Sequence, residues 1–438
     1  MKIKTLKKPY EEVAAIKPPK HKKPRRPSLL FHTLVRILSQ LDLWSTRFRQ
    51  IGSLPKDGPY LVLMNHSSFI DLKIASKILY PRPYHIVCTH DALIGKRWLM
   101  RLLGCIPTRK FVSDIALIRD MQYALKKGNN VLMYPEAGYS FDGKATPLPP
   151  RFGRLLKLLD VPVVFIETKG AFARDPLYNG LQLRRVPVSA HVSTLFTGEE
   201  VRTLSVEELD GRLESAFSFD NFAWQRENGI RIGETFRADG LERILYRCPF
   251  CQAEGKMRGE GIKLFCDACG KVHTLTELGE LSADDGDTRF SHIPDWYAWQ
   301  REAVRKEILD GTYLLDVPVD IGVLVDCRGL YTVGKGQLRH TPAGFFLTGC
   351  DGKLRYKQRA ISSYTLNSDY FWYEIGDVIG IGDHHALYYC FPPKGVSVAK
   401  ARLAAEELSK LHTDVNFHRL HMHFPEEMQE KTEAPMPV

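Results

Sequence analysis

Between residue 58 and about residue 200, short apolar segments alternate with segments of helical periodicity. Four of the apolar segments have the length and composition of buried strands: Tyr60–Met64, His85–Thr89, Val131–Pro135 and Val161–Glu167. The intervening stretches, near 69–80, 91–103, 113–127 and 153–159, predict helices. Such alternation is typical of an α/β domain, here a mixed sheet flanked by helices.

Residues 28–49 predict one amphipathic helix ahead of this domain. Its apolar side chains recur at alternating steps of four and three, which places them on one face: Leu30, Leu34, Ile37, Leu41, Trp44 and Phe48. This stripe either packs on the neighbouring domain or lies in the interface of a bilayer. Amphipathicity alone does not separate the two interpretations.

The second half of the chain changes character. Residues 205–247 are helical and connecting, and a cysteine module at 248–275 follows them. Beyond a helix near 293–309 the chain is rich in strands, and it ends in a helical pattern at 396–412. Strands closed by one helix suggest a β-rich domain that resembles a pleckstrin-homology-like domain in element order. The predicted parts are a flexible basic arm (1–27), an α/β domain with its amphipathic helix (28–246), a zinc ribbon (247–276), a β-rich domain (290–424) and a polar tail (425–438).

Charge narrows the class of partner. The formal net charge is +10, and residues 1–27 contain ten Lys or Arg: Lys2, Lys4, Lys7, Lys8, Lys17, Lys20, Lys22, Lys23, Arg25 and Arg26. Prolines 18, 19, 24 and 27 rule out a stable helix in this arm. A basic arm suits anionic partners, either phospholipid surfaces or nucleic acid. No apolar run approaches the roughly 18–20 residues of a spanning helix, and no secretory signal is evident. We therefore expect a cytoplasmic protein that is peripheral on the inner face of the membrane.

Four of the nine cysteines form two C-x-x-C pairs, Cys248/Cys251 and Cys266/Cys269, separated by fourteen residues. Two C-x-x-C pairs at this distance predict a tetrahedral zinc ion with four thiolate ligands. The zinc would be structural, because no coordination position is left open for water or substrate. The alternatives are free thiols or a redox pair. Zinc ribbons also bind nucleic acid, but the surrounding Lys and Arg have no clear aromatic interleaving. A strut between two domains is the preferred interpretation, and nucleic acid is not expected as a partner.

The candidate chemistry lies where the first strand ends, in the run Asn65-His66-Ser67-Ser68-Phe69-Ile70-Asp71. His66 is expected before a helix and Asp71 in its first turn, from which a carboxylate can reach back to one imidazole nitrogen. That bond leaves the other nitrogen free to take a proton from an alcohol. Amides at the helix start are expected to offset the negative charge on the attacked carbonyl. The alternative is a histidine packed at a strand end beside an unrelated aspartate, since His-x-x-x-x-Asp is common by chance.

Four ordered segments resemble the signature blocks of the glycerolipid acyltransferase family, whose type member acylates 1-acylglycerol-3-phosphate. The first is Asn65-His66-x-x-x-x-Asp71, the second Gly104-Cys105-Ile106-Pro107-Thr108-Arg109-Lys110, the third Tyr134-Pro135-Glu136-Ala137-Gly138-Tyr139-Ser140 and the fourth Val161-Pro162-Val163-Val164. The resemblance covers about residues 55–200. It implies that His66 and Asp71 are catalytic, and that Arg109, Lys110, Glu136, Gly138 and Tyr139 belong to the acceptor site.

One departure bears on the acceptor. The third block usually supplies an Arg that helps to hold the acceptor's phosphate, and Tyr139 stands in that place. Glu136 is retained, either as part of the acceptor site or as a charge that anchors its loop through backbone N–H groups.

The resemblance implies an O-acyltransferase that uses acyl carrier protein or acyl-coenzyme A as donor and a lysophospholipid as acceptor, chiefly 1-acylglycerol-3-phosphate. Two alternatives stay open. One is an acyltransferase for a non-phosphomonoester lysolipid or glycolipid. The other is a non-catalytic protein that binds lipid or nucleic acid.

Overall fold

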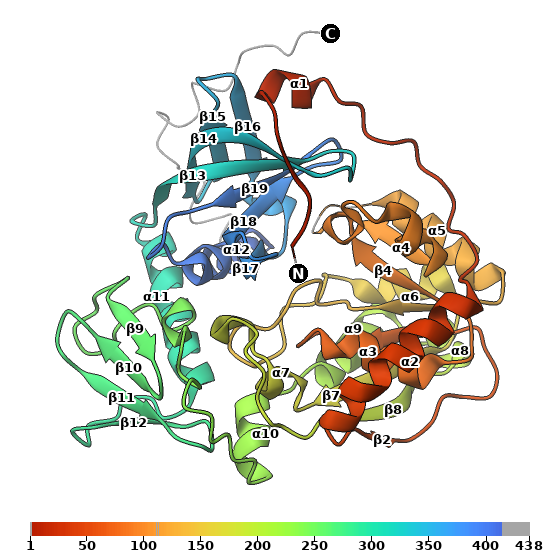
Figure 1. Ribbon diagram of the computed structural model, residues 1–438, viewed down its shortest axis with the longest axis horizontal. Coiled ribbons are helices and arrows are strands. Elements are labelled where there is room, and N and C mark those ends of the chain that lie inside the picture. The colour runs from red at the N-terminus through yellow and green to blue at the C-terminus, as the bar shows by residue number, and fades with distance from the viewer. Residues whose placement is uncertain (1, 111, 113, 414–438) are drawn as a thin grey trace.

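The structure, a computed structural model, describes residues 2–110, 112 and 114–413 of the chain. Three β-sheets and the helices around them make up the fold (Figure 1). The predicted tail at 425–438 and the last residues of the predicted β-rich domain lie outside the described residues.

The first sheet has seven strands in the order β2-β8-β7-β3-β6-β4-β5, and among the described residues its one antiparallel pair joins β7 to β8. This is the mixed sheet that the sequence predicts. Its strands are β2 (Arg49–Ile51), β3 (Leu61–Met64), β4 (Tyr84–Thr89), β5 (Cys105–Thr108), β6 (Asn130–Met133), β7 (Val163–Lys169) and β8 (Ser189–Phe196).

Strand β3 lies at the centre, and alternate side chains serve the two faces of the sheet. Val62 and Met64 pack with α2 and α3, whereas Leu61 and Leu63 pack with α5, α6 and α9. Both faces are therefore buried, as expected for parallel strands. The helices of this half are α2 (Leu29–Ser45), α3 (Ile70–Leu79), α4 (Arg97–Leu102), α5 (Ile115–Lys126), α6 (Phe152–Leu159), α7 (Ala171–Arg174), α8 (Gly198–Thr203), α9 (Val206–Ala216), α10 (Asn221–Glu227) and the 3-10 turns η1 (His90–Leu93), η2 (Leu177–Asn179) and η3 (Leu241–Arg243).

Three strands of this sheet, β2, β5 and β8, are not predicted by the sequence pattern. β2 and β5 are only three and four residues long, and β5 contains Pro107. β8 is a polar strand paired on both sides, with buried and more exposed positions interspersed along it. The helix expected near 91–103 is two elements, η1 and α4, divided at Gly95, which has a positive φ of 71°.

A four-stranded antiparallel sheet in the order β12-β11-β10-β9 forms the ribbon. It comprises β9 (Met257–Glu260), β10 (Lys263–Cys266), β11 (Val272–Leu275) and β12 (Leu281–Ala283), so it extends beyond the predicted end at residue 276. Helix α11 (Ile293–Leu309) lies between the ribbon and the C-terminal sheet (Figure 1). Buried residues of the ribbon, of α11 and of the C-terminal sheet form one hydrophobic cluster, which supports the strut interpretation.

The C-terminal sheet follows the antiparallel path β16-β15-β14-β13-β19-β18-β17. Its elements are β13 (Leu315–Leu324), β14 (Leu330–Thr341), β15 (Gly344–Gly349), β16 (Leu354–Arg359), η4 (Ala360–Ser362), β17 (Asn367–Trp372), β18 (Gly376–Gly382), β19 (Leu387–Phe391) and the closing helix α12 (Val398–Thr413). This is the predicted β-rich domain with a terminal helix.

The N-terminal arm differs from the flexible segment that the sequence predicts. β1 (Thr5–Lys7) pairs in parallel with Leu330–Thr332 of β14, and α1 (Tyr10–Ala14) buries Val13. The helix forms because it ends before Pro18, and Pro9 takes its N-cap position, where the missing N–H costs nothing, so the prolines do not exclude it. From α1 the arm runs along the outside of the molecule to α2 (Figure 1), and His21 meets Asp120 of α5 on the way.

The stripe on α2 is open to solvent. Five of its side chains are exposed: Leu30, Leu34, Ile37, Leu41 and Trp44, the last at 83%. Within the described residues no helix combines the length and apolar character needed to traverse a bilayer.

Candidate active site and metal centre

The turn between β3 and α3 brings His66 and Asp71 together. β3 ends at Met64 and α3 begins at Ile70, so Asp71 lies in the first turn of the helix, as predicted. Its Oδ2 is 3.2 Å from His66 Nδ1 and accepts the backbone N–H groups of Ser67 and Ser68 at 2.8 and 2.9 Å. The carboxylate thus fixes both the loop and the ring.

The imidazole of His66 lies between two phenol rings. Tyr134 and Tyr139 each stack on it with ring centroids 4.2 Å away. Burial raises the pKa of both phenols well above the usual range, so neither ring carries charge next to the imidazole at neutral pH. Nε2 of His66 has no hydrogen-bond partner among the described residues, and the side chain keeps 18% of its exposure. This nitrogen is available to a bound molecule.

Strand β7 supports the turn from the neighbouring position in the sheet. Asn65 donates to the carbonyl of Thr168 at 3.0 Å and accepts its N–H at 2.7 Å. The hydroxyl of Thr168 lies 3.5 Å from Asp71 Oδ1. Just after β7, Asp175 accepts the hydroxyl of Ser68, and burial raises its pKa to about 6.

Thr168, Asp175 and Tyr134 are parts of the site that the sequence pattern does not predict. The available signal was strand order: parallel β3 and β7 are neighbours, so the residues at their carboxyl ends meet at one edge of the sheet.

Glu136 anchors the third block. Its Oε2 accepts the N–H of His66 at 2.9 Å, and its Oε1 accepts the N–H of Thr146 at 2.8 Å. Burial raises the pKa of this carboxyl to about 7. Of the two interpretations left open by the sequence, this geometry supports the anchor that accepts backbone N–H groups.

The amides of Ser67 and Ser68 serve Asp71, so these two are not the oxyanion donors expected from the helix start. At the third block, Ala137 has a φ of +52°, a conformation that favours glycine, whereas Gly138 does not have a positive φ. The glycine therefore stands one position after the residue that has the left-handed backbone.

The two cations of the second block diverge. Arg109 lies close enough to His90 to help lower the pKa of that imidazole, after burial, to about 4. Lys110 instead faces the C-terminal domain, where it lowers the otherwise raised pKa of Asp369. Of the residues predicted for the site, Asp71, Glu136 and Tyr139 each contact His66, and Lys110 interacts with Asp369, which in turn interacts with Tyr139.

The C-terminal domain contacts the third block directly. Arg402 of α12 donates to the carbonyl oxygen of Tyr139 at 3.0 Å, and its guanidinium lies 4.4 Å from the ring centroid of Phe141. Phe141 also packs against Tyr370 of β17 at 4.6 Å. The sequence gives no sign of these contacts.

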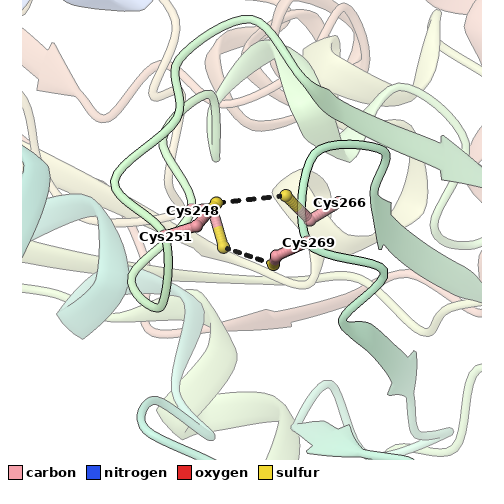
Figure 2. A group of neighbouring side chains, drawn as sticks. All are labelled: Cys248, Cys251, Cys266 and Cys269. Carbon is pink, nitrogen blue, oxygen red and sulfur yellow. Dashed lines mark hydrogen bonds between the residues drawn. The ribbon is translucent and has the colours of Figure 1, made fainter.

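The four cysteine side chains converge from two loops of the ribbon (Figure 2). All four Sγ atoms lie within 4.8 Å of one another, with Cys248–Cys269 at 3.8 Å and Cys251–Cys266 at 3.7 Å. These sulfurs are too far apart for disulfides, which need about 2 Å. Thiolates placed about 2.3 Å from one tetrahedral zinc ion would be about 3.8 Å apart. The cluster therefore fits zinc.

Comparison with known proteins gives a family and a similar solved structure. A family model described as Acyltransferase matches residues 45–166. The crystal structure of the 1-acyl-sn-glycerophosphate (LPA) acyltransferase PlsC from Thermotoga maritima matches with a TM-score of 0.34 and 17% identity, over 42% of this chain and 76% of that chain. A search of curated proteins found no match. The segment of this chain that contains His66, Asp71 and Glu136 is therefore the part that matches the Acyltransferase family model.

Proposed function

We propose that the protein is an O-acyltransferase that moves a fatty acyl group from a thioester donor to the hydroxyl of a lysophospholipid. The observation that carries this proposal is the His66–Asp71 pair, with Nδ1 engaged by the carboxylate and Nε2 available. The pair lies inside the acyltransferase-family segment.

In the proposed reaction His66 Nε2 takes the proton of the acceptor hydroxyl while the oxygen of that hydroxyl attacks the thioester carbonyl. The tetrahedral intermediate collapses with cleavage of the carbon–sulfur bond, and the thiol leaves with the proton. Asp71 orients the imidazole and stabilises its protonated form. Tyr134 and Tyr139 restrict the tilt of the ring from its two sides.

The acceptor that we propose is 1-acylglycerol-3-phosphate, which would be converted to phosphatidic acid. The donor is acyl-coenzyme A or an acylated acyl carrier protein. Tyr139 supports the second candidate, an acceptor without a phosphomonoester, because the usual cation of the third block is missing.

A product assay with purified protein tests these assignments. Both donors are offered with lysophosphatidic acid, lysophosphatidylethanolamine, monoacylglycerol and a glycolipid. Transfer chiefly to lysophosphatidic acid supports the first acceptor, and preference for another lysolipid supports the second. Salt-sensitive binding of polyanions with no acyl transfer to any acceptor would favour the non-catalytic alternative.

Two further parts of the proposal concern the rest of the chain. Cys248, Cys251, Cys266 and Cys269 hold structural zinc. The C-terminal sheet with its closing helix is pleckstrin-homology-like, a proposal supported by the meander β13–β16, the second set β17–β19 and helix α12.

We propose that the protein is peripheral on the inner face of the cytoplasmic membrane and docks through α2. Leu41 and Trp44 are exposed at 77% and 83%, which is unusual for large apolar side chains on one helix face. The ten Lys and Arg of the arm would add attraction to anionic lipid.

The docking proposal predicts that a Leu41→Glu/Trp44→Glu variant loses at least tenfold in affinity for vesicles of phosphatidylethanolamine and phosphatidylglycerol. Flotation of the full chain with these vesicles measures this affinity. Leu158→Glu, on the exposed side of α6, is the matched control and should float like the wild type. Equal flotation of all three proteins would refute docking through α2.

A further inference from the structure

A cavity lies at the seam of the C-terminal sheet. β16 and β17 are the two ends of the strand path and are not hydrogen-bonded to each other. Between them is a pocket of about 380 Å³, a volume typical of ligand sites. Gln358 of β16 accepts the N–H of Gly382 at 2.9 Å, which joins β16 to the end of β18, the strand next to β17.

The wall of this pocket is mainly cationic and polar, and the acidic side chain among its described lining residues is Asp383, which accepts the N–H groups of His385 and Ala386. Lys357 and Arg359 line it from β16, and Lys110 of the second block lines it from the acyltransferase-family segment. None of these three cations forms an ion pair with a described residue, although Lys357 lies 5.2 Å from the ring centroid of Phe346. Serine, threonine and asparagine side chains supply further donors: Ser362, Ser363, Thr365 and Asn367. Three unpaired cations and several hydroxyls around one cavity are what a phosphate group needs.

The pocket is connected to the candidate active site through β17. Asn367 lines the pocket, and Asp369, two residues on, lies on the same side of the strand. Asp369 interacts electrostatically with Lys110 and with Tyr139, and Tyr139 stacks on His66. The Oδ1 of Asp369 is buried and has no hydrogen-bond partner among the described residues, so it can accept a hydroxyl or amine of a bound molecule.

We propose that this seam pocket binds the phosphate-bearing headgroup of the lipid acceptor, with Lys110 and Arg359 as its cationic contacts. The inference rests on the proposed acyltransferase function and gives the C-terminal domain a part in acceptor choice. It also supplies cations where Tyr139 replaces the usual Arg of the third block. The group that the pocket would bind is the phosphate ester of a lipid headgroup. Free inorganic phosphate is the other ligand that offers the same group.

The test compares Arg359→Ala with Arg355→Ala. Both side chains are exposed on the same face of β16, and Arg355 does not line the pocket. For lysophosphatidic acid, Arg359→Ala is expected to raise KM about tenfold, because a charge-assisted hydrogen bond is lost. KM for monoacylglycerol and for the donor should stay unchanged, and Arg355→Ala should behave as wild type throughout. Equal KM values for lysophosphatidic acid in the two variants would overturn the proposal while leaving the acyltransferase activity intact.

A binding measurement keeps the pocket testable if no acyl transfer is found. Calorimetry of a short-chain lysophosphatidic acid with His66→Ala, alone and combined with either arginine variant, gives Kd without turnover. If Arg359→Ala raises the Kd about tenfold and Arg355→Ala does not, the pocket is supported even where the proposed reaction fails. If Arg359→Ala weakens binding of inorganic phosphate and leaves the lysolipid unaffected, a lipid headgroup is the wrong ligand and the proposal fails.

Discussion

One oxygen of Asp71 accepts two backbone N–H groups and faces His66 Nδ1. These contacts explain why the residue pair is predictable from sequence: His66 and Asp71 are five positions apart, and a strand followed by a helix start determines their relation. Thr168 and Asp175 reach the same turn from about a hundred residues away. Only the order of strands in the folded sheet brings them there, and no local pattern encodes it.

Glu136 makes the stability of the protein depend on pH in a definite direction. Its pKa rises from an ordinary 4.5 to about 7 in the folded chain, because burial disfavours the charge. The folded state therefore holds a proton that the unfolded state has lost between about pH 4.5 and 7. In that window this group lowers the free energy of unfolding as pH rises, by about 3 kcal/mol in total.

Urea unfolding of wild type and Glu136→Gln between pH 4.5 and 8 measures this contribution. The wild type should lose about 3 kcal/mol relative to the variant as pH rises to 7, and the difference should then stay level. A difference that does not change with pH would mean that Glu136 titrates normally in the folded chain.

At the scale of elements, long periodic segments were predictable and short or irregular ones were not. Helices α2, α3, α5, α6, α11 and α12 lie where the periodicity places them, within about two residues at most ends apart from the C-terminus of α2. β17 shows why other elements resist prediction. Its pairing with β18 shifts between Asp369 and Trp372, where Phe371 takes a φ of +52°. A bulge of this kind depends on tertiary packing and leaves no periodic trace.

The ribbon is the element whose stability we expect to depend on metal. Four thiolates that converge without an ion would repel one another, and the short sheet β9–β12 has a small core of its own. Cys251→Ser should release zinc and lower the thermal midpoint by several degrees, because the ribbon shares its hydrophobic core with α11.

Plasma emission spectrometry and a thermal scan check this prediction, with Cys390→Ser as the control. Cys390 is buried in β19, far along the chain from the cluster, and should leave the zinc content at one ion per chain. Full zinc content in Cys251→Ser, or none in the wild type, would contradict a four-thiolate site.

At the scale of the molecule, the C-terminal domain is joined to the candidate active site through α12. Arg402 is buried and donates hydrogen bonds to Tyr139 and Glu406. Glu406 also accepts hydrogen bonds from Arg301 and Thr365. The sequence predicted the separate parts in order, but not that the last helix would support the third block. That contact joins residues 263 positions apart and exists only once the domains have packed.

Arg402→Met is therefore expected to affect both stability and activity. Removing a buried guanidinium that pairs with Glu406 and donates to Tyr139 should lower the free energy of unfolding by about 3 kcal/mol. It should also lower kcat, since the backbone of Tyr139 loses its donor. Arg305→Met is the matched control: Arg305 is 38% exposed and pairs with Glu407, so about 1 kcal/mol or less is expected, with normal activity. Unchanged kcat in Arg402→Met, assayed well below its unfolding temperature, would show that α12 does not support the site.

The most direct measurement is the rate of thiol release from an acyl thioester in the presence of a lysolipid, compared between wild type and His66→Ala. If the imidazole beside Asp71 takes the proton of the acceptor alcohol, His66→Ala should lose about a thousandfold in rate. His191→Ala, which alters an exposed histidine of β8, should keep the wild-type rate. A His66→Ala protein that transfers acyl groups as fast as the wild type would contradict the account.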